Sequence, residues 1–350
     1  MAAVPEPSDA SLADPGAALD VVGIGNALVD VLSAVPDATL IDLGLVRGSM
    51  ELVDLARAED IYAATRQTIE VSGGSAANTM AGVAALGGAA GYIGKVADDD
   101  MGRVFLHDMR ALGVQVEAAV VRTQAAGAEA TGTGRSIVLV TGDAERTMAT
   151  HLGVAATLTV RDISEELISR ARILYLEGYL WDLGPAKEAM RRAVEIAHAH
   201  SCSVALSLSD SFCVDRHRRD LLDLVVSDLD ILFGNADEIC RLFGTESLSR
   251  ALASAEETGV LVAATSGPDG SKVVAPGRVM DVPPAPTSEI VDRTGAGDLY
   301  AAGFLYGLTH GSGPEDCARL GSLCASEVIS HLGARPERDL AKLAREAGLA

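Results

Sequence analysis

Aromatic side chains are scarce in this 350-residue sequence. Phe, Trp and Tyr together make up 3% of it, whereas hydrophobic residues make up 48%. The core must therefore consist mainly of Ala, Val, Leu and Ile, which suit helices packed closely on a parallel sheet. No apolar run approaches the roughly 18 residues that a membrane-spanning helix requires, so we expect no membrane segment.

Cysteine and basic residues are also few. The five Cys are odd in number and form no C-x-x-C pair, which argues against a disulfide framework or a zinc site and favours a reducing cytoplasm. The net charge of −21 argues against binding to nucleic acid or anionic membranes. A nucleotide substrate stays possible, because local N–H groups and Mg²⁺ can outweigh the global charge. Residues 1–19, rich in Ala, Pro, Ser and Asp, are interpreted as a disordered tail.

Several catalytic motifs are missing. The sequence contains no G-x-x-x-x-G-K-[ST] phosphate loop, no protein-kinase motif set, no G-x-S-x-G and no H-E-x-x-H. A dinucleotide fingerprint also fails near the first predicted strand, because Leu28 stands where its third glycine belongs. These absences exclude the common nucleotide-binding loops and make a serine hydrolase or a metalloprotease a poor fit.

Strand-like and helix-like segments alternate regularly from residue 172 onward. This rhythm predicts an α/β fold whose mostly parallel sheet is covered by helices on both faces. Residues 20–350 are expected to form this domain. Segments at about 31–70 and 113–141 lack the rhythm, and we expect them to form a separate small sheet.

One stretch combines three features suited to phosphoryl transfer: Val291-Asp292-Arg293-Thr294-Gly295-Ala296-Gly297-Asp298. The carboxylate of Asp298 lies at a predicted helix start, the glycines allow several N–H groups to point at one spot, and the helix adds its positive end. Together these features predict an anion hole beside a general base. The same pattern also fits a glycine-rich turn with a capping aspartate.

Other polar groups follow predicted strands, where ligands of open α/β sheets collect. Each also has a plain structural interpretation as a turn residue, a helix cap or a solvated arginine. The Asn235 and Glu238 pair, for example, fits a magnesium–phosphate site and equally fits a capping box. The further candidates are Asn26, Asp30, Gly73, Gly74 and Asn78 for substrate, Arg146 for a phosphate, and Thr265, Gly267 and Gly270 for a triphosphate.

Five sequence elements occur in the order seen in the ribokinase-like (PfkB) carbohydrate and nucleoside kinases, which the chain resembles over residues 20–335. They are Gly25-Asn26 with Asp30, Gly73-Gly74 to Asn78, Gly94 to Gly102, Asn235 to Glu238, and Thr294 to Asp298. The resemblance implies a Rossmann-like domain with a small β-sheet lid, and transfer of a phosphoryl group from ATP, with Mg²⁺, to a hydroxymethyl group.

The resemblance also implies roles for single residues. Asp298 would be the general base and residues 295–297 the anion hole. Asn235 and Glu238 would hold Mg²⁺ and phosphate, with Glu238 acting through water. Substrate hydroxyls would contact Asp30, Gly74 and Asn78. A monovalent cation such as K⁺ would involve Asp292 and Thr294.

The segments 25–30 and 207–212 resemble the adenosine kinase branch of the family. The sequence therefore predicts phosphorylation of a nucleoside 5′-hydroxyl, with ribose or fructose as the alternative substrates and a regulator without turnover as a third possibility. Phe212, Trp181 and Tyr179 are the aromatic candidates for contact with a base. Monomer and homodimer stay open, and the charge of Arg293 inside the motif is unexplained.

Overall fold

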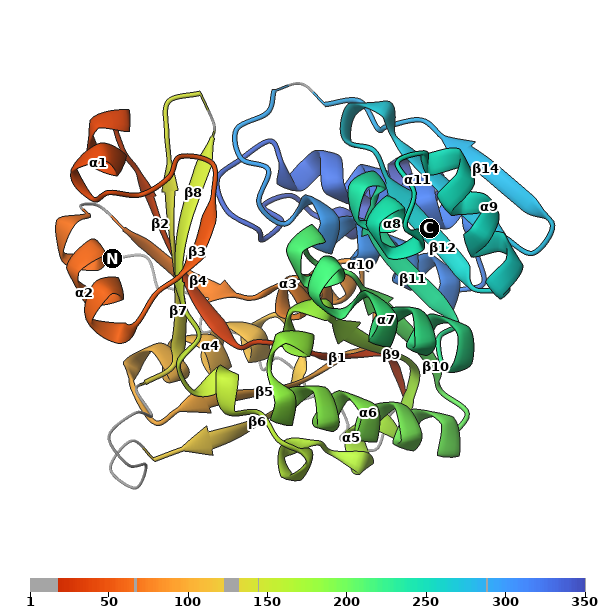
Figure 1. Cartoon of the computed structure of the whole chain (residues 1–350), viewed down its shortest axis with the longest axis horizontal. Helices are drawn as coiled ribbons and strands as arrows, with labels where there is room; N and C mark the ends of the chain where they lie inside the picture. Colours follow the sequence, from red (N-terminus) through yellow and green to blue (C-terminus); the bar gives the residue numbers. More distant parts are fainter. Residues whose placement is uncertain (1–17, 66–67, 123–131, 144, 288, 350) are drawn as a thin grey trace, which may run out of the picture.

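A computed structural model describes residues 18–65, 68–122, 132–143, 145–287 and 289–349. Its larger sheet has the strand order β14-β13-β12-β11-β10-β9-β1-β5-β6 (Figure 1). The strands from β12 to β6 are parallel, and β13 and β14 are added antiparallel. Their bounds are β1 Leu19–Ile24, β5 Ala90–Ala97, β6 Gln115–Val121, β9 Ala171–Glu177, β10 Ser203–Ser207, β11 Ile231–Asn235, β12 Leu261–Thr265, β13 Ser271–Ala275 and β14 Arg278–Val282.

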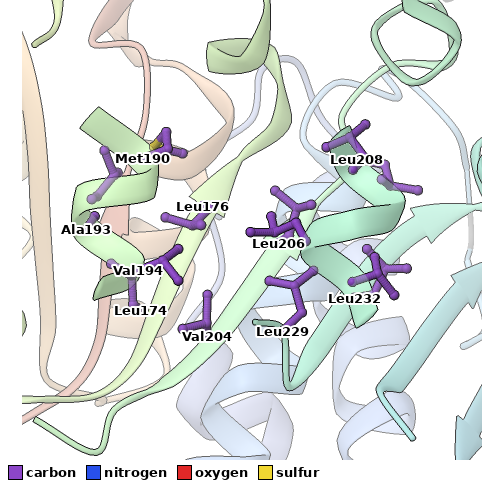
Figure 2. Close-up of a cluster of buried hydrophobic side chains, with 14 of the residues drawn as sticks. Leu174, Leu176, Met190, Ala193, Val194, Val204, Leu206, Leu208, Leu229 and Leu232 are labelled. Atoms are coloured by element: carbon purple, nitrogen blue, oxygen red, sulfur yellow. The ribbon is translucent and has the colours of Figure 1, made fainter. Parts of the chain in front are cut away.

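Helices cover both faces of this sheet, because its strands are apolar on both sides. Leu174 and Leu176 of β9 point to one face and pack against Met190 and Val194 (Figure 2), whereas Tyr175 packs on the other. The first face is covered by α5 Glu165–Ile168, α6 Gly184–Ala199, α7 Ser211–Ser227, α8 Ala236–Phe243 and α9 Leu248–Thr258. The second is covered by α3 Ser75–Ala85, α4 Asp100–Ala111, α10 Ala296–Thr309, α11 Pro314–Val328 and α12 Leu340–Glu346.

A second, five-stranded sheet has the order β3-β8-β7-β2-β4 and stands beside the larger one (Figure 1). Its strands are β2 Leu28–Ala34, β3 Met50–Leu52, β4 Ile69–Gly73, β7 Gly134–Val140 and β8 Arg146–His151. Helices α1 Asp37–Asp42 and α2 Leu55–Ala64 cover one face, where Leu40 and Ile61 join Val31 and Ile137 in a small core. The opposite face therefore stays available to a ligand.

The predicted α/β fold with a small second sheet is confirmed, but the predicted bounds of that sheet need correction: β8 belongs to it, although its residues 146–151 lie beyond the predicted segments. Segment 113–121 was expected in the small sheet, but β6 pairs in parallel with β5 at the edge of the larger sheet. The reason is that α4 connects β5 to β6 as an ordinary crossover, and an edge strand alternates in polarity just as a lid strand does. The predicted tail at 1–19 lies outside the described residues, except for the last two positions, of which Leu19 is buried at the start of β1 and so does not belong to a tail.

Within the described part of the chain, no helix is both long and apolar enough to cross a bilayer.

Candidate active site

A cavity of about 620 Å³ lies between the two sheets. The larger sheet contributes the last residues of four neighbouring parallel strands, namely Glu177, Ser207, Asn235 and Thr265. The small sheet contributes side chains from β2, β3, β7 and β8. Because the carboxyl ends of parallel strands meet at one edge, the topology brings these polar groups together without any being close in sequence.

Asp298 lies in the first turn of α10, as predicted, and lines this cavity. Its Oδ1 accepts a hydrogen bond from the Ser75 hydroxyl at 2.7 Å, and its Oδ2 accepts one from the Asn78 amide at 2.8 Å. Burial raises the pKa of Asp298, while these two hydrogen bonds oppose the rise. The carboxylate is thus held in one orientation by α3 and keeps free lone pairs for a substrate proton.

The glycines before Asp298 differ in what they do. Gly295 has φ +78°, and a Cβ there would lie 2.7 Å from the Cβ of Ala334, so a larger residue does not fit. A Cβ on Gly297 would meet no atom within 4 Å, and Gly297 lines the cavity. The first N–H groups of a helix have no partner inside it. Gly297 therefore leaves open space beside a positive helix end, which suits a phosphate.

The predicted substrate residues Asn26, Asp30, Gly73, Gly74 and Asn78 lie together around the start of α3. Gly74 has φ +95°, and a Cβ there would overlap the carbonyl oxygen of Asn26; a Cβ on Gly73 would overlap the carboxylate of Asp30. Burial raises the pKa of Asp30 to about 7. The side-chain oxygens of Asn26 and Asn78 are buried and find no hydrogen-bond partner among the described residues. Buried acceptors without donors fit the hydroxyl groups of a bound sugar.

Glu177 is a site residue that the sequence analysis missed. Its Oε1 accepts from the Asn26 side-chain amide at 2.7 Å, and its Oε2 accepts from the backbone N–H of Ala76 at 3.0 Å. It ties the end of β9 to the segment between β1 and β2 and to α3, and burial raises its pKa to about 7. Its position as the last residue of a strand is the only signal that the sequence carries.

Asn235 and Glu238 form a capping box at the start of α8. The Glu238 carboxylate accepts from the backbone N–H and the side chain of Asn235 at 2.9 and 2.7 Å, and the Asn235 side chain accepts from the Glu238 N–H at 2.9 Å. Burial raises the pKa of Glu238 to about 7, and the nearby Asp210 and Asp237 add to the rise. Both interpretations of this pair are compatible with the structure, because the box also lines the cavity.

The remaining triphosphate candidates lie at different distances from the cavity. Thr265 lines it, whereas Gly267 and Gly270 do not. Gly270 has φ +84°, and a Cβ there would overlap the carbonyl of Val282, so this glycine is required by the turn between β12 and β13. Its binding role and that of Gly267 stay predictions.

Three arginines line the cavity, Arg146 from the start of β8, Arg216 from α7 and Arg293 from the segment before α10. Arg293, whose charge inside the motif the sequence left unexplained, is exposed and forms part of the cavity wall. Asp292 is fully buried, and its carboxylate accepts from Thr294 N and Oγ1 at 2.9 and 2.6 Å and from Gly333 N at 2.9 Å. These bonds tie the motif to the segment after α11; a cation there stays a prediction.

The three aromatic candidates separate clearly. Trp181 is 1% exposed and belongs to the core, whereas Phe212 is 69% exposed and lines the cavity together with Tyr179. The cavity wall also contains the apolar residues Met50, Leu52, Met148 and Leu152. Exposed apolar groups gathered on one wall are unusual for a surface that contacts only water.

The model of the pfkB family carbohydrate kinases matches residues 41–339. Adenosine kinase 1 of Arabidopsis thaliana is 29% identical over 344 residues, covering 89% of this chain and 94% of that protein.

Two solved structures are similar at higher identity. The adenosine kinase from Sinorhizobium meliloti is 44% identical with a TM-score of 0.88, and the probable sugar kinase from Rhizobium etli CFN 42 is 42% identical with a TM-score of 0.87. In each case 95% of this chain and 100% of the other are covered. With the family match over most of its length, this chain belongs to the pfkB family of carbohydrate kinases, a family of sugar and nucleoside kinases.

Proposed function

We propose that this kinase transfers a phosphoryl group from ATP to the 5′-hydroxyl of a nucleoside, with adenosine as its main substrate. The observation that carries the proposal is the placement of Asp298 beside Gly297 at the positive end of α10. Asp298 would accept the proton of the attacking hydroxyl, and the N–H groups of the first helical turn would stabilise the negative charge that develops on the transferred group.

The acceptor sugar would lie on the α3 side of Asp298. The Asp30 carboxylate and the unpaired side-chain oxygens of Asn26 and Asn78 would accept hydrogen bonds from ribose hydroxyls. The tight packing at Gly73 and Gly74 keeps the backbone close enough to these groups to shape the subsite. A ribose held this way would place one hydroxyl next to the general base Asp298, whereas a loosely bound ribose would bring different hydroxyls there in turn.

The nucleotide would enter from the strand ends of β11 and β12. Asn235 and Thr265 lie there, with Arg146 and Arg293 near the expected phosphates. Mg²⁺ would be held by Glu238 and Asn235 through water, because their direct hydrogen bonds already form the capping box, and it would neutralise phosphate charge. The oxygen donors of Asp292 and Thr294 suit a K⁺ ion, which we include in the proposal.

A nucleoside fits the cavity better than a free sugar does, because of its apolar wall. Met50, Leu52, Met148 and Leu152, together with Phe212, would contact a base, whereas a hexose has no comparable apolar surface. The adenosine kinases at 44% and 29% identity support this choice. The probable sugar kinase at 42% identity supports the alternative, phosphorylation of ribose or fructose.

The small sheet would act as a lid. β2, β3 and β8 contribute cavity residues, so movement of this sheet towards the larger one would enclose the substrate and exclude water. The covered outer face, where α1 and α2 pack, leaves the inner face free for this task.

The test is a coupled ADP-release assay with adenosine, inosine, guanosine, ribose and fructose. We expect the highest kcat/KM with adenosine and a product phosphorylated on the 5′-oxygen. Preference for ribose or fructose would replace the proposal with its alternative. No turnover with any of the five would favour a regulatory role.

A further inference from the structure

Arg335 lies behind the proposed active site, in the segment that follows α11. Its Nε donates to the carbonyl of Ser72 at 3.0 Å, its Nη1 to the carbonyl of Ala77 at 2.8 Å, and its Nη2 to the hydroxyl of Ser72 at 3.0 Å. One guanidinium group therefore joins the C-terminal segment to both β4 and α3.

Ser72, which Arg335 holds, lies at the junction between the small sheet and α3. Ser72 is followed by Gly73 and Gly74, which connect the small sheet to α3. The N–H of Ser72 donates to the Asp108 carboxylate at 3.0 Å, so all three polar groups of Ser72 are fixed by two side chains from other parts of the chain. The turn that shapes the substrate subsite is thereby anchored to the rigid side of the molecule.

Arg335 also carries charge towards the carboxylates of the site. Burial raises the pKa of Asp30 and of Asp298, and the positive charge of Arg335 opposes that rise at both; at Asp298 it acts after the Ser75 and Asn78 hydrogen bonds and the charge of Arg146. Desolvation in turn lowers the pKa of Arg335 to about 10, which leaves it protonated at neutral pH. The guanidinium therefore stays positively charged in the same charged network as Asp298.

The charged network around Asp298 contains both acidic and basic groups. Asp30 from β2, Asp292 before α10 and Glu177 from β9 are acidic groups in the same charged network, and Tyr175 and Tyr179 are neutral. The cations are Arg146 of β8, Arg335, and the exposed Arg293. Arg146 belongs to the small sheet, whereas Arg335 is bonded to α3, the helix that also holds Asp298 through Ser75 and Asn78.

We propose that Arg335 is a positioning residue that fixes the Ser72–Gly74 junction and α3, and thereby the Asp298 carboxylate that α3 holds. This inference rests on the proposed function, because it assigns a partner to the same base. The hydrogen bonds of Arg335 alone would give it a structural role. Its charge should also affect how turnover depends on pH.

The experiment compares pH profiles of kcat/KM for Arg335→Met, Arg335→Lys and Ser72→Ala. Removing the cation should raise the pKa of Asp298, so we expect the acid limb of the Arg335→Met profile to move up by about one pH unit, with at least a tenfold loss of kcat at pH 7. Arg335→Lys retains the charge and should restore the position of the limb while KM stays raised. Ser72→Ala should raise KM without moving the acid limb from its wild-type position.

Arg218→Met is the matched control, since Arg218 also donates to two carbonyls, those of Arg241 and Leu242, but does not line the cavity. Its profile should coincide with that of the wild type. If Arg335→Met fails to fold, Arg335→Gln gives the same comparison, because it keeps donors for the carbonyls without the charge.

An acid limb that stays in place in the uncharged Arg335 variants, or that moves equally in Arg335→Lys, overturns the inference. The proposed function survives that result if Asp298→Asn still lacks turnover. Conversely, undiminished turnover of Asp298→Asn removes the proposed base whatever the Arg335 profiles show.

Discussion

Glu177 is a buried carboxylate whose charge state should affect stability in a defined pH window. Burial raises its pKa from 4.5 to about 7 in the folded protein, while its hydrogen bonds from Ala76 and Asn26 oppose the rise. The folded state then binds more protons than the unfolded state between those two pH values. Its contribution to the free energy of unfolding is fully present below pH 4.5 and is lost as the pH rises through 7.

The size of this loss follows from the shift in pKa. A change of one pKa unit corresponds to about 1.4 kcal/mol, so the shift of Glu177 corresponds to roughly 3 kcal/mol between pH 4.5 and pH 8. Glu177→Gln has nearly the same shape and cannot titrate. It replaces one acceptor by a donor next to the Asn26 amide, which adds a constant destabilisation at every pH.

The prediction therefore concerns how the difference in unfolding free energy between wild type and variant changes with pH. Urea unfolding of wild type and Glu177→Gln at half-unit steps from pH 5 to 8, followed by far-UV circular dichroism, should give a difference in unfolding free energy that changes by about 3 kcal/mol in favour of the variant as the pH rises. Parallel curves would refute the reasoning, because they would show that Glu177 titrates alike in the folded and unfolded states.

Two further predictions concern the cavity wall. Gly297→Ala should fold with unchanged or slightly higher stability, since its Cβ meets no atom and Ala favours a helix. Its kcat should fall at least tenfold, because the methyl group occupies the phosphate space. Gly184→Ala, at the start of α6 and outside the cavity, is the control, and equal kinetics of the two variants would contradict the anion hole. Phe212→Ala should raise KM for adenosine about tenfold while leaving the melting temperature unchanged, because the ring is 69% exposed; a KM raised equally for ribose would show that the ring does not contact a base.

The sequence predicted those parts of the fold that depend on local pattern. The alternation of apolar strands and helices after residue 172 indicated β9 to β12 with their helices, and the glycines before Asp298 marked the start of α10 correctly. Membership of a sheet is a different matter. β6 alternates like a lid strand, and only its pairing with β5 places it in the larger sheet.

The supporting residues of the site were harder to predict because their contacts are distant in the sequence. Ser75 follows Gly74, the cap position of α3, and its hydroxyl reaches Asp298, 223 residues away. Arg335 reaches Ser72 across 263 residues, and Glu177 reaches Asn26 across 151. A lone Arg or Glu carries no local pattern that distinguishes such a partner from a solvated side chain.

The roles within the site divide along the same line. Residues in compact motifs, such as Asp298 with its glycines, are proposed to perform the reaction, and isolated residues such as Glu177 and Arg335 hold them in place. This division explains why the sequence predicted the kinase family but not the residues that support its motifs. It also explains why substitutions at isolated positions should change pH dependence and KM.

The central claim is that Asp298 is the base for phosphoryl transfer, and single-turnover kinetics of Asp298→Asn test it most directly. Asn keeps the shape and the contact with Ser75, so binding of adenosine, measured by calorimetry, should change less than tenfold. The rate of the chemical step should fall by about three orders of magnitude or more. A chemical step within tenfold of the wild-type rate, with adenosine bound normally, would contradict the account.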